Sequence, residues 1–352
     1  MSQAQSKATS PSVLRLAILA SILTAIVVSL FLFFYPSSSV NAASTSASAP
    51  SLTKDGMGTF NNIYEPSAAL QLPDGRVLIV EDEEHRALNI LKISDNGSLI
   101  ENAEDNLKLS QGFEHKLDDL EGLTADHNGF TYITTSHSSL KNGKRRHNRE
   151  QLIRFRVIGD TVQDVSTVKT LRDELTHSKS LIKAIKTKTG ENPNFDALNI
   201  EGLTYAHKTD DLLLGLRAPM AGESAIIVAI KNPAEVFEKN ATPIFGQPIF
   251  LNLGGGGIRS LHFSTILNKY VIANEVPDAK GKDYSKIWTW SGNVKDAPVA
   301  VDLPELADLK NIEGIDSVKV NGVPKLLFTA DEGNEKKEIA AKYRFVDEAK
   351  FK

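Results

Sequence analysis

Three segments of the chain share one string around a Glu-Gly pair: DLEGLTAD at 119–126, NIEGLTYA at 199–206 and NIEGIDSV at 311–318. In each copy a short run of alternating apolar residues leads through a turn into a second run, which is the pattern of a β-hairpin. Looser copies lie at 64–82 and 258–275. A chain built from one recurring hairpin has few folds open to it, so this repeat is the strongest constraint in the sequence.

Each hairpin is followed by a polar loop and another β-rich run, such as QLIRFRV or KIWTWSG. The copies open at Glu65, Glu121, Glu201, Arg259 and Glu313, with spacings of 56, 80, 58 and 54 residues. Sheets of about four strands that recur every 40–50 residues or so indicate a β-propeller. The sequence therefore predicts an all-β propeller of five blades, with a degenerate sixth left open. A segment near 53–62 would complete the last blade and close the ring.

The long second interval contains TLRDELTHSKSLIKAIKTKTG at 170–190. Thr170 and Asp173 resemble a capping pair, and Gly190 can end a helix. An apolar stripe at helical spacing comprises Leu171, Leu175, Ile182 and Ile185. We predict a helical insertion near 171–189, between the second and third blades.

The N-terminus carries a run of twenty uncharged residues, Leu16 to Tyr35. As a helix it would be about 30 Å long, enough to cross a bilayer, and the preceding Lys7 and Arg15 would keep the N-terminus cytoplasmic. Small residues ending at Ala42 also resemble a signal-peptide cleavage site. The segment is thus either a retained anchor or a cleaved signal, and we expect export to the periplasmic or extracellular face. The expected parts are 1–42 (signal or anchor), 43–58 (flexible tether) and 59–352 (propeller).

Composition excludes several classes of protein. The chain has no Cys, which rules out disulfide scaffolds, thiolate metal sites and a cysteine nucleophile. The net charge of −4 gives no reason to expect nucleic acid as a partner. No HExxH, GxSxG or Gly-Lys-Ser/Thr phosphate loop occurs. The oligomeric state stays open.

Ionisable residues recur at the open end of each predicted hairpin, where the innermost strand of a blade begins. They should therefore surround one mouth of the central channel. The ten residues are Glu65, Glu81, Glu121, His137, Glu201, Arg217, Arg259, Glu275, Glu313 and Asp331, and Asp82 adjoins Glu81. Seven carboxylates against two arginines repel one another unless a cation or raised pKa values compensate.

Two interpretations of these carboxylates stay open. An all-oxygen set suits Ca²⁺, and its ligands would be Glu65, Glu121, Glu201, Glu313 and Asp331. Alternatively, each glutamate bonds to the backbone or to an arginine of the neighbouring blade and only fixes the ring. Recurrence in almost every blade favours this structural role.

A basic run follows the second hairpin. Residues 141–156 hold seven Lys and Arg against Glu150, a net charge of +6 in an otherwise acidic chain. The run is either a solvated loop leading into a strand or part of an anion site with His137, Ser138 and Arg217. In that site His137 would transfer protons. Four glycines, 254–257, precede Arg259 and are expected at the same mouth, as a loop or as backbone close to a ligand.

The strings at 119–155 and 200–230 resemble the bacterial family labelled domain of unknown function 3616, and the likeness spans most of residues 60–346. The resemblance rests on the Glu-Gly-Leu strings, the Ser-His-Ser segment with its basic loop, and Gly-Leu-Arg-Ala-Pro at 215–219. The resemblance implies a propeller related at fold level to esterase-like and phytase-like propellers, and hence a Ca²⁺-dependent phosphoester site.

Two functions remain at this point. In the first, an exported and membrane-tethered propeller binds a small anionic ligand, with or without a divalent cation, and hydrolyses a phosphoester or ester. His137, Arg217 and Arg259 would then be catalytic and the carboxylates would hold the metal. In the second, the protein is a non-enzymatic binding or scaffold propeller at the cell surface.

Overall fold

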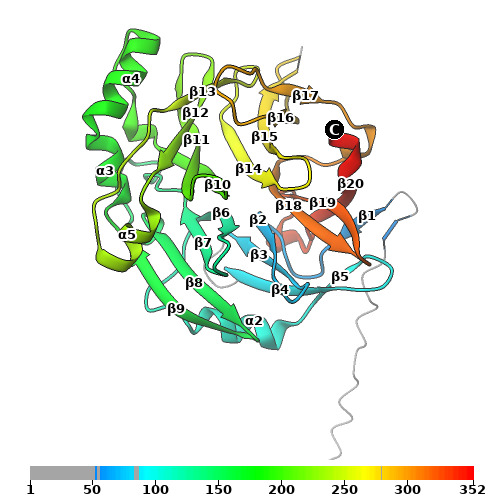
Figure 1. Ribbon diagram of the computed structural model, residues 1–352. Helices are drawn as coiled ribbons and strands as arrows, with labels where there is room; N and C mark the ends of the chain where they lie inside the picture. The colour runs from blue at the N-terminus through cyan, green and yellow to red at the C-terminus, as the bar shows by residue number, and fades with distance from the viewer. Residues whose placement is uncertain (1–51, 54–55, 83–86, 279) are drawn as a thin grey trace, which may run out of the picture. The chain divides into compact units, whose positions relative to one another are not determined.

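The computed structural model describes residues 52–53, 56–82, 87–278 and 280–352. In this part of the chain five four-stranded antiparallel sheets surround one centre, as the blades of a propeller do (Figure 1). The innermost strands β2, β6, β10, β14 and β18 contact one another around the ring. The prediction of an all-β, five-bladed propeller is confirmed.

The strands follow the predicted order, from the inside of each blade outward. Blade 1 contains β2 (Pro66–Gln71), β3 (Val77–Glu81), β4 (Leu88–Ile93) and β5 (Leu99–Glu101); blade 2 contains β6 (Leu120–Ala125), β7 (Thr131–Thr135), β8 (Leu152–Ile158) and β9 (Thr161–Val168); blade 3 contains β10 (Asn199–Ala206), β11 (Asp211–Ala221), β12 (Ser224–Ile230) and β13 (Ile249–Asn252); blade 4 contains β14 (Ile258–Ser264), β15 (Lys269–Pro277), β16 (Asp283–Trp290) and β17 (Val299–Val301).

Blade 5 closes the ring with a strand from the other end of the described chain. Its order is β18 (Ile312–Val320), β19 (Val323–Ala330), β20 (Lys342–Asp347) and, outermost, β1 (Met57–Thr59). Residues 57–59 of β1 pair antiparallel with residues 344–342 of β20. The predicted closure by a segment near 53–62 is therefore confirmed.

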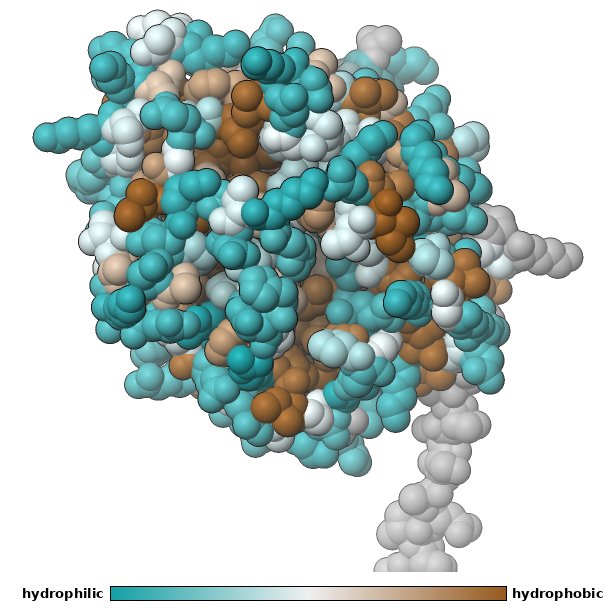
Figure 2. Space-filling view, in the orientation of Figure 1, coloured by the Kyte–Doolittle hydropathy of each residue, from teal (hydrophilic) through white to brown (hydrophobic). Residues whose placement is uncertain are grey.

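Five hydrophobic clusters among the described residues correspond to the five junctions between neighbouring blades. Each cluster combines inward-facing residues of one sheet with those of the next; Leu78 and Ile153, for example, share the cluster between blades 1 and 2. Because every blade contributes residues to the hydrophobic clusters on both of its sides, the ring is held together mainly by the burial of apolar side chains between sheets. Hydrophilic residues cover much of the face seen in Figure 2, with apolar residues in scattered patches.

A β-bulge opens the innermost hairpin of every blade. The extra, unpaired residue is Ser67, Glu121, Glu201, Arg259 or Glu313 in blades 1 to 5. A bulge turns its extra side chain away from the regular alternation of the strand. The glycine after the glutamate is explained by packing, since a Cβ at Gly122 would collide with Leu203 and one at Gly202 with Ile258 of the next blade.

A belt of hydrogen bonds joins neighbouring blades three to four residues beyond each bulge. Thr124 Oγ1 accepts the Tyr205 N–H at 3.1 Å, and Thr204 Oγ1 accepts the Phe263 N–H at 3.1 Å. At the next junction His262 Nε2 lies 2.8 Å from Ser317 Oγ, and Asp316 Oδ2 then accepts the Gln71 N–H at 2.6 Å. Four of the five junctions have this bond, and at the fifth the equivalent position is the apolar Leu70.

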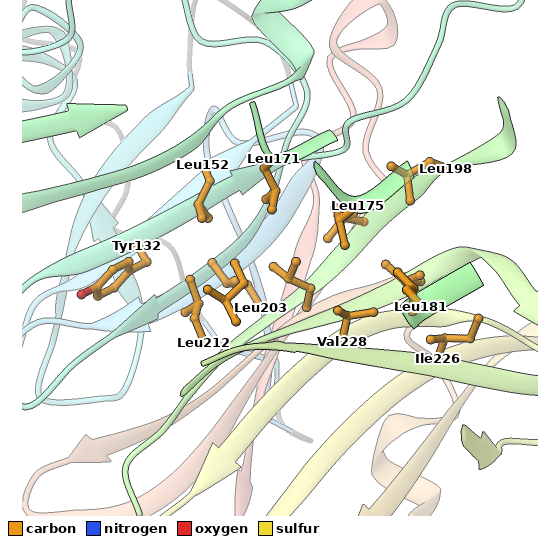
Figure 3. Close-up of a cluster of buried hydrophobic side chains, with 14 of the residues drawn as sticks. Tyr132, Leu152, Leu171, Leu175, Leu181, Leu198, Leu203, Leu212, Ile226 and Val228 are labelled. Atoms are coloured by element: carbon orange, nitrogen blue, oxygen red, sulfur yellow. The ribbon is translucent and has the colours of Figure 1, made fainter. Parts of the chain in front are cut away.

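The helical insertion lies between blades 2 and 3 as predicted, but it forms two helices. These are α3 (Leu171–His177) and α4 (Lys179–Thr189), which break at Ser178, whose hydroxyl accepts the Leu181 N–H at 3.4 Å. The break shifts the buried stripe, so that Leu181 rather than Ile182 packs on the core with Leu175 (Figure 3). Gly190 ends α4 in the left-handed conformation, as expected, whereas Thr170 makes no side-chain capping bond.

The other helices within the described residues are short. They are α2 (Ala103–Ser110) and α5 (Pro233–Lys239), with single 3₁₀ turns η1 (His147–Arg149), η2 (Phe195–Ala197), η3 (Pro304–Leu306), η4 (Glu335–Lys337) and η5 (Glu348–Phe351). No helix within the described residues has the length and apolar character needed to span a bilayer. The predicted anchor or signal at 1–42 and most of the tether lie outside the described residues.

Candidate functional site

Side chains from all five blades line one cavity of about 250 Å³. It contains every residue expected to hold a metal, together with both expected arginines. The lining residues are Glu65, Ser67, Asp82, Glu121, Glu201, Arg217, Arg259, Glu313 and Asp331. The predicted gathering of charged side chains at one mouth of the ring is thus present.

The bulges explain why these side chains meet. Four of the lining residues, Glu121, Glu201, Arg259 and Glu313, are bulge residues of innermost strands. A second set comes from the second strand of the blade. The residue just before the bulge pairs with a residue of that strand, and the cavity residue is the next one along the chain. Asp82, Arg217 and Asp331 occupy this position in blades 1, 3 and 5.

The same register corrects two of the expected positions. Leu120 pairs with Thr135, so the counterpart of Arg217 in blade 2 is Ser136, not His137. Likewise Pro66 pairs with Glu81, which makes Asp82 the cavity residue of blade 1. Successive side chains of a strand point to opposite faces, so an error of one residue moves a side chain out of the cavity.

His137 consequently lies in the interior, away from the cavity-lining set. It is fully buried, and burial lowers its pKa to about 3, so that the ring is neutral. Its carbonyl oxygen accepts a hydrogen bond from Arg172 of α3. Glu81 is also structural, because its carboxylate accepts the Tyr64 N–H at 2.9 Å and the Asn89 amide at 2.9 Å.

Arg259 is the electrostatic centre of the site. Its buried guanidinium pairs with Glu313 of blade 5 and, at 3.2 Å from Nη1 to Oε2, with Glu201 of blade 3. Its Nε lies 3.6 Å from Glu275 Oε2 within its own blade. Burial alone would lower the arginine pKa, but Glu313 and Glu201 outweigh it and raise the pKa. Arg259 therefore joins three consecutive blades through ion pairs.

Arg217 occupies a more open position. Its Nη1 lies 2.8 Å from Glu201 Oε1, while 46% of its side chain is exposed. Glu201 is consequently held by two guanidinium groups. Burial nevertheless raises the pKa of Glu201, against the opposing effect of Arg259 and Arg217.

Glu121 is the exception among the carboxylates. It is 9% exposed and, among the residues described here, it makes no hydrogen bond or ion pair. Burial raises its pKa well above the ordinary value, and the nearby Glu201 and Glu313 raise it further. The pKa of Glu313 is also raised by burial, and that of Asp331 is raised to about 6 for the same reason.

The glycine run lies against this site, as predicted. A Cβ at Gly256 would collide with the carbonyl oxygen of Glu275, and one at Gly257 with that of Arg217. Gly254 and Gly255 have φ values of 75° and 92°, which L-residues rarely adopt. The run thus lets the chain pass directly behind two charged residues of the mouth.

The basic run does not leave its arginines free for an anion, because each one faces a carboxylate of the protein. Arg145 bonds to Glu150 through two nitrogens at 2.7 Å and to Asp173 of α3 at 2.7 Å. The others pair as Arg146 with Asp118, Arg149 with Asp118 and Asp119, Arg154 with Glu238, and Arg156 with Asp164.

The run instead fixes the helical insertion to blade 2. Burial acts to raise the pKa of Glu150, but the Arg145 hydrogen bonds outweigh it and lower the pKa. Arg172, which is 5% exposed, donates to Ser139 Oγ at 3.2 Å as well as to the carbonyl of His137. These partners could not be predicted from the local sequence, because they lie up to 84 residues away, as Glu238 does from Arg154.

The expected calcium ligands share the cavity, but within the described part of the chain no three His, Asp or Glu side chains are arranged to hold one metal ion. In the arrangement present, Arg259 supplies positive charge between Glu201 and Glu313. Calcium binding stays a prediction.

Comparisons with known proteins give one family and several similar solved structures. A family model described as "Protein of unknown function (DUF3616)" matches residues 156–340, more than half of the chain. No curated protein matches. Similar solved structures include a putative oxidoreductase (glucose dehydrogenase) from Thermus thermophilus, at 14% identity, 82% of this chain, 99% of that chain and a TM-score of 0.42. A mannose phosphorylase from Leishmania mexicana in complex with phosphate ion matches at 11% identity, over 82% and 84% of the two chains, with a TM-score of 0.41.

Proposed function

We propose that this chain, which belongs to the family of proteins of unknown function DUF3616, is a propeller that binds a small polar ligand at the mouth of its central channel. One observation carries the proposal. All five blades direct side chains into a cavity of about 250 Å³, and one of them, Glu121, is buried there without a partner among the residues that the structure describes. Buried polar groups are ordinarily satisfied, and a ligand is a common reason for an exception.

In its enzymatic form the proposal is hydrolysis of a phosphoester or ester by acid–base chemistry. Burial raises the pKa of Glu121 above its ordinary value, so this carboxyl group keeps its proton to higher pH than an exposed glutamate and can donate it to a substrate. Asp331, with a pKa of about 6, is ionised above that pH and can accept one. Arg217 is exposed enough to contact negative charge that develops on the substrate.

The anionic ligand and the calcium ion expected from the sequence belong together in this proposal. Six carboxylates and two guanidinium groups line the cavity, a formal charge of 2 − 6 = −4. Arg217 and Arg259 already pair with Glu201. An anion would therefore need a cation beside it to offset the carboxylates. Calcium would be held by Glu65, Glu121, Glu201, Glu313 and Asp331, and would supply a Lewis acid.

A non-enzymatic scaffold is the second candidate, and the ion pairs of Arg259 favour it. This residue links blades 3, 4 and 5, which is what a purely structural set of charges would do. The two candidates differ over Glu121, because a carboxylate without a partner contributes nothing to holding blades together.

The decisive experiment measures thermal unfolding of the purified full-length chain with Ca²⁺, inorganic phosphate, a phosphoester and lactone panel, and small polar metabolites. Bound metal is assayed in parallel. We expect at least one class of compound to raise Tm. Arg217→Ala should lower the apparent affinity for that compound, measured from the concentration dependence of the shift, at least tenfold. Glu191→Gln, an exposed carboxylate of the insertion, is the matched control.

A chain that holds no metal, is stabilised by no compound and turns over no ester would leave only the scaffold. The proposal also includes an exported, N-terminally tethered location. Sequencing of the mature N-terminus and protease access in intact cells test it. A mature chain beginning near residue 43 would mean release, and a start at Met1 on an exported chain would mean a retained anchor.

A further inference from the structure

Glu121 indicates which kind of ligand the cavity takes. Its side chain is about nine-tenths buried, lines the cavity, and is bonded to no group among the described residues. A buried carboxylate costs several kcal/mol unless it is paired or protonated, so Glu121 in its ionised form needs a cationic partner that the described residues do not supply. A group that donates hydrogen bonds and carries positive charge would complete it.

The protein's own cations at the cavity are already committed to other carboxylates. Arg259 pairs with Glu201, Glu275 and Glu313, and Arg217 pairs with Glu201. Neither forms an ion pair with Glu121 within the described chain. The formal charge of −4 over the lining residues adds to the demand for a cation from outside.

The size of the cavity favours an organic cation. A volume of about 250 Å³ corresponds to roughly eight water molecules at about 30 Å³ each. A bare metal ion would leave most of that space to water, whereas a small organic cation would occupy more of it. The cavity already shows the required chemistry, because its carboxylates take N–H donors from Arg259 and Arg217.

We propose that the ligand of this cavity is a small organic compound with a protonated amine, and that its ammonium group pairs with Glu121. The inference rests on the proposed function, a small polar ligand in this cavity, and it replaces the anion-plus-calcium form of that proposal with an organic cation. The hydroxyl of Ser67 and the carboxylates of the surrounding blades would accept hydrogen bonds from the rest of the molecule.

Matched pairs of compounds test this with the full-length protein. Glucosamine is compared with glucose, and 1,4-diaminobutane with 1,4-butanediol, by isothermal titration calorimetry. Ca²⁺ and inorganic phosphate are titrated separately. The variants are Glu121→Gln, which keeps the shape of the side chain and removes its charge, and Glu191→Gln as the control. Glu121→Gln removes a repulsive buried carboxylate and should fold at least as well as the natural chain.

We expect an amine to bind at least tenfold more tightly than its neutral partner, and Glu121→Gln to abolish that preference while Glu191→Gln keeps it. Three results would overturn the inference and leave the proposed function intact. They are equal binding of the neutral partners, binding of phosphate alone, and Ca²⁺ binding that depends on Glu121 without any amine binding. If none of the compounds binds and the wider panel also fails, both fall.

Discussion

Asp316 carries the sharpest stability prediction of this structure. The residue belongs to the hydrogen-bond belt between blades and is 6% exposed. Its Oδ2 accepts the Gln71 N–H at 2.6 Å, and its Oδ1 lies 3.3 Å from His262 Nδ1. Burial raises the pKa of Asp316 to about 8 and lowers that of His262 to about 3. Both groups are therefore neutral in the folded protein at pH 7.

The sign of the pH dependence follows from the proton balance. An unfolded Asp316 titrates near its ordinary pKa of 3.8 and the folded one near 8, so the native state binds more protons between these values. Its contribution to stability is full below about pH 4 and is lost as the pH rises to 8. At about 1.4 kcal/mol per pH unit, the loss amounts to roughly 5 kcal/mol.

Asp316→Asn removes this titration and keeps the bonds. The amide oxygen still accepts the Gln71 N–H, and the amide nitrogen can donate to neutral His262. We expect the variant to match the natural protein at pH 4.5 to within about 1 kcal/mol and to exceed it by several kcal/mol at pH 8.

Urea unfolding followed by fluorescence at both pH values measures the difference, and every other titrating group cancels between the two chains. A variant that is less stable than the natural protein at pH 8 would refute the reasoning. That outcome would mean that Asp316 is ionised and paired with a protonated His262.

Three further perturbations have clear expected outcomes. Arg259→Met leaves buried carboxylates of two neighbouring blades without their cation, so it should lower the free energy of unfolding by about 3 kcal/mol or more, as urea titration would show. Gly257→Ala forces a methyl group into the carbonyl of Arg217 and should cost about 1–3 kcal/mol, with Gly246→Ala, whose Cβ would meet only side-chain atoms, the nearest at 3.3 Å, as a comparison. Arg172→Met removes bonds that hold α3 to blade 2, so limited proteolysis within 169–197 should accelerate at least several-fold while thermal unfolding of the ring changes little; unchanged cleavage would contradict the role of Arg172 in fixing the insertion.

The repeat was enough to predict the fold because each hairpin is specified by residues that lie close together in the sequence. The Glu-Gly strings and their turns fix each innermost hairpin, and the interval of 80 residues marks the insertion. The closing strand was also predictable, because the last copy has too few strands of its own.

The lining of the cavity was predicted for the same reason, and its errors arise because the innermost hairpins differ in length. The bulge residue and its counterpart on the next strand are one residue closer in blade 2, with Glu121 and Ser136, than in blade 3, with Glu201 and Arg217, so one constant spacing fails. Aligning blade 1 on Glu65 rather than on the bulge residue Ser67 shifted its copy by two positions, and His137 was taken where Ser136 belongs.

The partners of the basic run could not have been read from the sequence. Whether Arg149 faces a phosphate or Asp118 depends on which loops the finished ring brings together. The same holds for His262, whose bond to Ser317 exists only because blades 4 and 5 are neighbours.

The pairing of β1 with β20 also fixes an order of events during synthesis. Met57 emerges from the ribosome long before its partner Arg344, so the early strand must wait, unpaired, for nearly the whole chain. Any nascent or prematurely terminated product lacking the final strand leaves blade 5 with two of its four strands and the early strand with nothing to pair against. Incomplete chains should consequently be recognised and degraded.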